Sequence, residues 1–111
     1  MTKRQKFQFF TDPGHGWLRV PLETVDALGV KPSKFSYRNT QWAYLEEDCD
    51  VTLFMVAWHD AHGCLPTLVH REPSNVDSPI RRYKRFSGEG FSRETMTAAA
   101  GRVSEILGGA Q

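Results

Sequence analysis

One histidine and several carboxylates are placed where folding could join them into a single site. Asp12 and His15 lie in a turn near the N-terminus. A dense acidic block lies further along the chain and comprises Glu46, Glu47, Asp48 and Asp50. Carboxylates beside a histidine can transfer protons, bind hard cations or assist hydrolysis. One alternative is therefore a small metal-dependent hydrolase that uses Asp12, His15 and this block, with Glu46 and Glu47 as further catalytic candidates.

The same carboxylates also have a structural explanation. Negative charge at a helix N-terminus is favourable by about 0.3 to 1 kcal/mol, and Asp48 or Asp50 suits the cap of a following helix. In the turn, Asp12 can accept backbone hydrogen bonds, and glycines at 14 and 16 allow positive φ. The requirements of a tight turn thus explain Asp12 and the two glycines, but they do not explain His15. The sequence therefore assigns no catalytic residue, and we predict neither a resident metal nor a cofactor.

The cysteines and the remaining histidines form no complete site in the sequence. His59, His62 and Cys64 lie close together, but a structural zinc needs four ligands, and no CxxC or HxxxH spacing supplies the rest. Neither Cys49 nor Cys64 lies in a nucleophile motif, and we expect both to be reduced and buried. The run Gly14–Gly16 lacks the spacing of a phosphate-binding loop.

The basic segment 80–86 is the strongest interaction signal in the chain. The residues that we expect to contact a partner are Arg81, Arg82, Tyr83, Lys84 and Arg85. Their cations could neutralise phosphates while an aromatic ring stacks on a base, and arginine also suits acidic protein surfaces. Direct nucleic-acid binding is therefore a second alternative. The segment could instead be an edge strand whose cations prevent aggregation or pair with the acidic block.

Size and composition place the chain among ordinary globular domains. It has 111 residues, of which 40% are hydrophobic and 24% charged, with a net charge of +1. We expect a single domain over residues 1–111. The longest mostly apolar run, residues 51–58, is less than half of the roughly 20 residues that span a bilayer, and the polar N-terminus precedes no secretion signal. We therefore predict no membrane association and a location in the cytoplasm.

Hydrophobic periodicity predicts an α+β fold: a small, mostly antiparallel sheet of four to five strands, packed by one central helix and completed by two further helices. The expected strands are residues 6–10, 17–20, 35–37, 42–45 and 65–70. The central helix runs from Asp48 or Asp50 to His62, and a short helix covers 21–28. A C-terminal helix from 92 to 107 has a narrow apolar face and could form a homodimer. The expected core is Phe7, Phe9, Leu18, Val20, Leu22, Val25, Leu28, Trp42, Tyr44, Val51, Phe54, Met55, Trp58, Leu68 and Val69.

Two stretches carry a resemblance to a known family. They are F-T-D-P-G-H-G-W-L-x-V-P, residues 10–21, and Y-L-E-E-D-x-D, residues 44–50. They resemble a family of small uncharacterised proteins encoded by bacteriophages and other mobile elements. The likeness covers residues 7–58, with an echo at 81–83. It implies an accessory protein in the host cytoplasm and no transferable catalytic residue.

The resemblance shapes the functional prediction. Small phage proteins often bind host machinery, so the first hypothesis is a non-enzymatic protein that binds a host protein or a protein–nucleic-acid complex. By the same analogy, this protein could inhibit a defence system such as CRISPR.

Overall fold

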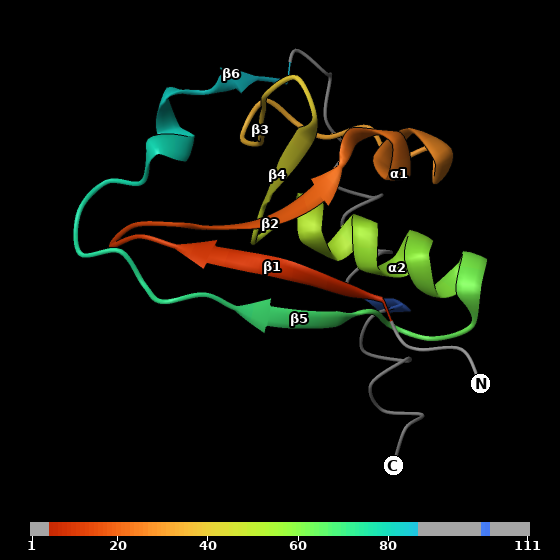
Figure 1. The fold of residues 1–111 in the computed structure, drawn as a ribbon. Helices are drawn as coiled ribbons and strands as arrows, with labels where there is room; N and C mark the ends of the chain where they lie inside the picture. The colour runs from red at the N-terminus through yellow and green to blue at the C-terminus, as the bar shows by residue number, and fades with distance from the viewer. Residues whose placement is uncertain (1–4, 87–100, 103–111) are drawn as a thin grey trace.

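Six strands form one mixed sheet in the order β5-β1-β2-β4-β3-β6 (Figure 1). The structure is a computed structural model that describes residues 5–86 and 101–102. The strands are β1 (Lys6–Thr11), β2 (Gly16–Pro21), β3 (Tyr37–Arg38), β4 (Trp42–Glu46), β5 (Thr67–His70) and β6 (Lys84–Arg85). All neighbours are antiparallel except β1 and β5, which are parallel. The predicted α+β class is confirmed, with one strand more than expected.

Two helices follow the predicted periodicity. They are α1 (Leu22–Ala27) and α2 (Asp50–His62), and Gly63 ends α2 at a φ of 79°, a left-handed conformation that glycine adopts without steric cost. The cap prediction is wrong, because the N-cap position of α2 is Cys49 and no side chain caps it. A short 3-10 helix, η1 (Pro79–Arg82), precedes β6.

The main core lies between the sheet and the two helices (Figure 1). Alternation along the strands turns one set of side chains to this side, since successive residues of a strand point to opposite faces. The buried members are Phe7, Phe9, Leu18, Val20, Val25, Val30, Ala43, Leu45 and Phe54. Phe54 of α2 packs edge-on against Phe7 with ring centroids 5.3 Å apart, which joins the helix to the centre of the sheet.

The opposite face carries a second, aromatic cluster. Its buried members are Trp17, Tyr37, Tyr44 and Ile80, and Phe10, Trp42 and Tyr83 pack against them. Ile80 and Tyr83 come from η1 and the residue after it, so this part of the chain covers the face that the helices leave open. The candidate site forms at the margin of this cluster.

Most of the predicted core residues are buried or partly buried. Val69 is the exception, with 38% of its surface exposed, because β5 is an outer strand of the described sheet. Strand β3 begins at Tyr37, later than predicted. The predicted C-terminal helix 92–107 and its dimer contact lie outside the described residues, apart from the helical pair 101–102, in which Arg102 donates a hydrogen bond to Asp60.

No helix in the part of the chain that the structure describes has the length and the apolar character required to cross a membrane.

Candidate functional site

Asp12 organises the turn between β1 and β2. Its Oδ1 accepts hydrogen bonds from the backbone amides of Gly14 and His15, each at 3.1 Å. Its Oδ2 accepts from the amide of Ser78 at 2.9 Å. Arg81 completes the set, with Nε 2.6 Å from Oδ2 and Nη2 2.9 Å from Oδ1. Asp12 therefore joins the turn to a segment more than sixty residues later, as the bond to Ser78 shows.

This fully buried carboxylate has an altered acidity. The hydrogen bond from Arg81 lowers the pKa of Asp12 far below its usual range, and the three backbone donors lower it further against the opposing effect of burial. Asp12 is thus ionised at neutral pH, and all of its acceptor positions are directed at the protein itself. A catalytic or metal-binding role for Asp12 would require breaking the ion pair with Arg81.

The two glycines of the turn are needed for space and not for their backbone angle. Among the described residues, positive φ occurs only at Gly29 and Gly63, so neither Gly14 nor Gly16 uses the positive φ that glycine allows. A Cβ at Gly16 would lie 2.7 Å from Cζ of the Phe9 ring. A Cβ at Gly14 would lie 2.9 Å from Nη2 of Arg81. Both glycines allow another side chain to approach the backbone.

Replacing Gly16 with alanine is expected to lower the free energy of unfolding by about 1 to 3 kcal/mol, because the Phe9 ring is buried and cannot move aside. Urea denaturation measures the loss. The comparison variant is Gly14→Ala, whose new methyl group meets Nη2 of Arg81, an atom of a partly exposed side chain rather than of a buried ring. We expect a smaller loss there, and equal losses in the two variants would contradict the assignment of the Gly16 effect to Phe9.

The basic segment divides into one internally paired cation and three exposed ones. Arg81 is bound to Asp12, and its guanidinium lies over the Trp17 ring at 5.5 Å from the centroid. Arg82, Lys84 and Arg85 are exposed. Tyr83 is half-buried, with its ring centroid 5.2 Å from that of Tyr44. Sequence reasoning treated all five residues alike, whereas the structure gives Arg81 and Tyr83 a role in holding the segment on the sheet.

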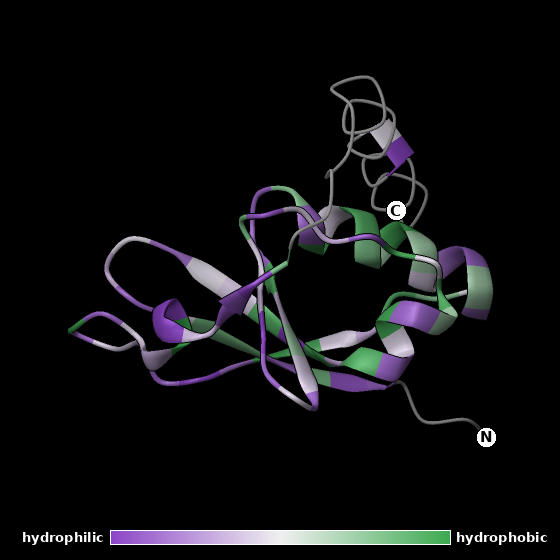
Figure 2. Cartoon of the chain, turned by 90° about the horizontal axis from the view of Figure 1, so that it is seen from above, coloured by the Kyte–Doolittle hydropathy of each residue, from purple (hydrophilic) through white to green (hydrophobic). Residues whose placement is uncertain are grey.

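Strand β6 places like charges opposite each other at the edge of the described sheet. Arg38 of β3 and Lys84 of β6 are direct partners in the antiparallel register, and both are exposed. Figure 2 shows β6 as a hydrophilic strand, in purple. Like charges directly opposite on neighbouring strands are destabilising. We name the exposed cations Arg38, Arg82, Lys84 and Arg85 the basic edge.

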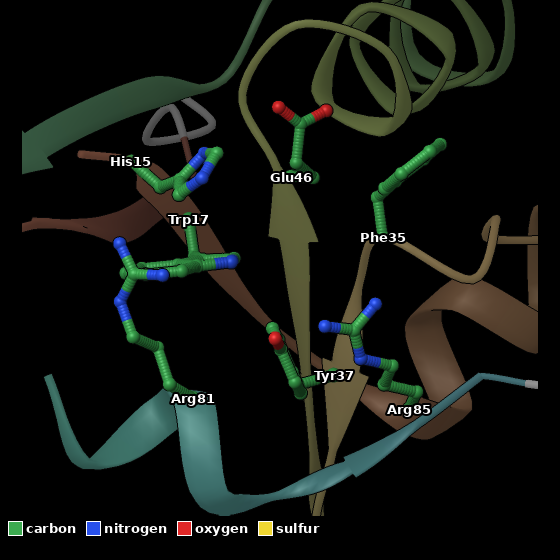
Figure 3. Close-up of a pocket in the computed structure, with 7 residues that line it drawn as sticks. All are labelled: His15, Trp17, Phe35, Tyr37, Glu46, Arg81 and Arg85. Carbon is green, nitrogen blue, oxygen red and sulfur yellow. The ribbon is translucent and has the colours of Figure 1, made fainter.

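A pocket of about 100 Å³ lies beside the basic edge (Figure 3). It is lined by His15, Trp17, Phe35, Tyr37, Glu46, Arg81 and Arg85. These residues come from the first turn, from β2, β3 and β4, from the loop before β3 and from the η1–β6 segment, so the pocket forms only when all of these segments are in place. The two arginines and Glu46 lie on opposite sides of it in Figure 3.

Glu46 is a buried carboxyl group at the end of β4. Its Oε2 accepts a hydrogen bond from the amide of Cys49 at 3.1 Å, which holds the turn into α2. Burial raises its pKa, and the amides of Asp48 and Cys49 oppose that change only in part. His15 is exposed at the rim, with its ring centroid 6.0 Å from that of Trp17. The pocket therefore unites two of the four catalytic candidates, His15 and Glu46.

The rest of the acidic block does not join that pocket. Glu47 and Asp48 are exposed, and the amide of Glu47 donates to the carbonyl of Gly16 at 3.1 Å. Asp50 is fully buried elsewhere. Within residues 5–86 and 101–102, no group of three or more His, Cys, Asp or Glu side chains could hold a metal ion. The structure thus leaves Asp48 and Asp50 outside the pocket and pairs Asp12 with Arg81.

Asp50 belongs to a buried network that sequence reasoning missed. Its Oδ2 accepts from the amide of Ser33 at 3.0 Å, from Ser33 Oγ at 2.9 Å and from Ser36 Oγ. Ser36 Oγ in turn accepts from the amide of Glu46 at 2.9 Å. Within the described chain, Oδ1 of Asp50 has no partner. Two serines in a polar loop carry little pattern, so no sequence signal could have identified this network.

Neither cysteine is disulfide-bonded, and Cys49 lacks the environment of a nucleophile. Both are unpaired and partly buried, so the prediction of free thiols is confirmed and that of full burial is not. Burial raises the pKa of Cys49, and the carboxylates of Glu46, Asp50 and Asp48 raise it further. A raised pKa keeps the thiol protonated and unreactive at neutral pH.

Comparisons with protein-family models, with curated protein sequences and with solved structures found no match to this chain. The features of the chain that bear on function are a basic edge and, beside it, a small pocket walled by aromatic rings and guanidinium groups.

Proposed function

We propose that this chain is a non-enzymatic accessory protein of a phage or other mobile element, and that it acts by binding an anionic surface of a host protein or of a protein–nucleic-acid complex. The observation that carries this proposal is the basic edge. Arg38 and Lys84 face each other at a cost in stability that an acidic partner would remove. Arg82 and Arg85 extend the same charge outward.

An exposed aromatic side chain beside the basic edge favours a protein partner. Phe35 has 53% of its surface exposed and lines the same pocket as Trp17, Tyr37 and Arg85. Aromatic residues and arginine are the residue types enriched at the energetic centres of protein interfaces. Electrostatic attraction would speed the encounter, and the aromatic rings would supply the affinity. By analogy with other small phage proteins, the proposed class of target is a defence complex such as a CRISPR effector.

Affinity capture from host lysate tests the proposal. The tagged wild-type protein is expected to retain a stoichiometric partner at low salt and to release it as salt rises. The Arg82→Gln/Lys84→Gln variant is expected to lose that partner. The matched control is Lys6→Gln/Arg71→Gln, which removes two exposed cations at the opposite side of the sheet, next to β5. Equal capture by both variants, or no capture by the wild type, would contradict the proposal.

Direct binding of nucleic acid is the second candidate, and one observation favours it. A groove beside β6 is lined by Arg38, Asn39, Thr40, Tyr83 and Lys84, which combines two cations with an aromatic ring. Gel shifts with single- and double-stranded oligonucleotides at several salt concentrations distinguish the two candidates. A shift with naked nucleic acid that disappears in Arg82→Gln/Lys84→Gln would favour this second function over protein binding.

A further inference from the structure

The pocket beside the basic edge has an unequal distribution of charge. The charge of Arg81 is matched by Asp12, whose side chain is fully buried against it. Arg85 forms no ion pair with a carboxylate among the described residues, and its Nη1 reaches only the carbonyl of Lys34 at 3.5 Å. One guanidinium on this wall is therefore paired, and one is available.

Aromatic rings hold both guanidinium groups at the pocket wall. Arg81 lies 5.5 Å from the centroid of Trp17, and Arg85 lies 5.2 Å from the centroid of Tyr37. The two rings meet edge to face, with centroids 6.2 Å apart. Stacked guanidinium groups keep the edges of their plane accessible, and in Arg81 Asp12 occupies Nε and Nη2, which leaves Nη1 to face a ligand. The wall thus presents planar donors that are already ordered, which lowers the entropy cost of binding.

The size and charge of the pocket limit its ligand. A volume of about 100 Å³ is well below that of sites for drug-sized molecules and suits a single side-chain group. Arg85 supplies the one cation of the lining that no carboxylate of the described residues pairs with, and Glu46 is the one carboxyl group of the lining. A phosphate monoester carries about −1.5 to −2 at neutral pH and would exceed the charge of Arg85. A carboxylate carries a single negative charge and fits the fork of an arginine.

We infer that this pocket receives one carboxylate group, presented by an aspartate or glutamate side chain of a protein partner, with Arg85 as the residue that binds it and Arg81 as the fixed second donor. The inference depends on the proposed function only for the source of the carboxylate. An ionised Glu46 on the opposite wall repels an anion and therefore lowers the affinity of the pocket for a carboxylate.

The test is a titration of the isolated protein with N-acetyl-glutamate amide. Binding is monitored through the NMR signals of the Trp17 indole and of the arginine side chains. We expect a dissociation constant on the order of 1 mM, typical of so small a ligand. N-acetyl-glutamine amide has the same shape without the charge and is expected not to bind. Equal binding of the two compounds would overturn the inference.

Variants identify the binding group. Arg85→Gln is expected to weaken binding of N-acetyl-glutamate amide by about tenfold or more, because a charge-assisted hydrogen bond is lost. Glu46→Gln is expected to strengthen it by about threefold in the pH range where Glu46 is ionised, because the variant removes that negative charge. Lys6→Gln, an exposed change in β1, is the control and leaves the affinity unchanged. Unaltered binding in Arg85→Gln with a native spectrum would overturn the assignment.

Two further probes distinguish the source of the anion. N-acetyl-alanine carries a chain-terminal carboxylate, and inorganic phosphate carries the larger charge. Tighter binding of either probe than of N-acetyl-glutamate amide would contradict an acidic side chain as the ligand. Because these titrations contain no partner, they can succeed when affinity capture fails, and capture can succeed when they fail. One proposal can therefore be contradicted while the other is supported.

Discussion

Replacing Asp12 with alanine is expected to lower the free energy of unfolding by about 3 kcal/mol at pH 7, measured by urea denaturation. The substitution leaves the amides of Gly14 and Ser78 without their acceptor and leaves Arg81 without its counter-charge. Asp12→Asn is the matched comparison. Its carbonyl oxygen can still accept from the turn amides, but its amide group cannot accept from Arg81. We expect an intermediate loss for Asp12→Asn.

The stability difference between wild type and Asp12→Asn should depend on pH. The pKa of Asp12 is lower in the folded protein than in the unfolded chain, so the unfolded chain binds the proton more readily. The contribution of the carboxylate is therefore fully present above its ordinary value of about 3.9 and declines as the pH falls below it. A difference that stays constant from pH 7 to pH 2.5 would show that the ion pair with Arg81 is not the cause.

Replacing Asp50 with alanine is also expected to cost about 3 kcal/mol, because three donors from Ser33 and Ser36 lose a buried acceptor. The double variant Asp50→Ala/Ser36→Ala separates this network from the effect of the cavity. Residues that share one network show non-additive losses. We therefore expect the double variant to be clearly more stable than the sum of the single losses predicts, whereas simple additivity would contradict a shared network.

Local periodicity was sufficient to predict the centre of the fold. Alternation in β1, β2 and β4 and the helical spacing of α2 arise from neighbouring residues, which a sequence displays directly. The outer strand β6 has only two residues, and it exists because Tyr37 and Arg38 provide a partner. A two-residue strand has no period to detect, so segment 80–86 was recognised by its charge and not by its structure.

The charged residues and the histidine of the candidate site were predictable, whereas its aromatic walls of Trp17, Phe35 and Tyr37 and its pairings were not. His15 and Glu46 were both identified, and both line the pocket. Asp12 was grouped with the acidic block because both are acidic and near potential turns, yet its partner is Arg81 from the opposite end of the described chain. Hydrogen bonds between residues distant in sequence depend on the complete topology, which residue types and spacing do not encode locally.

The strand order also fixes when each part of the sheet can form. Strands β1 to β4 are synthesised first and lie inside the strand order, whereas β5 and β6, at its two ends, come from later in the chain. A growing chain therefore exposes unpaired strand edges until residue 85 has emerged from the ribosome. Pairing of β1 with β5 and of Asp12 with Arg81 closes long loops, which slows folding. The basic edge is thus among the last parts of the described fold to form, so a partner that recognises it binds only nearly finished molecules.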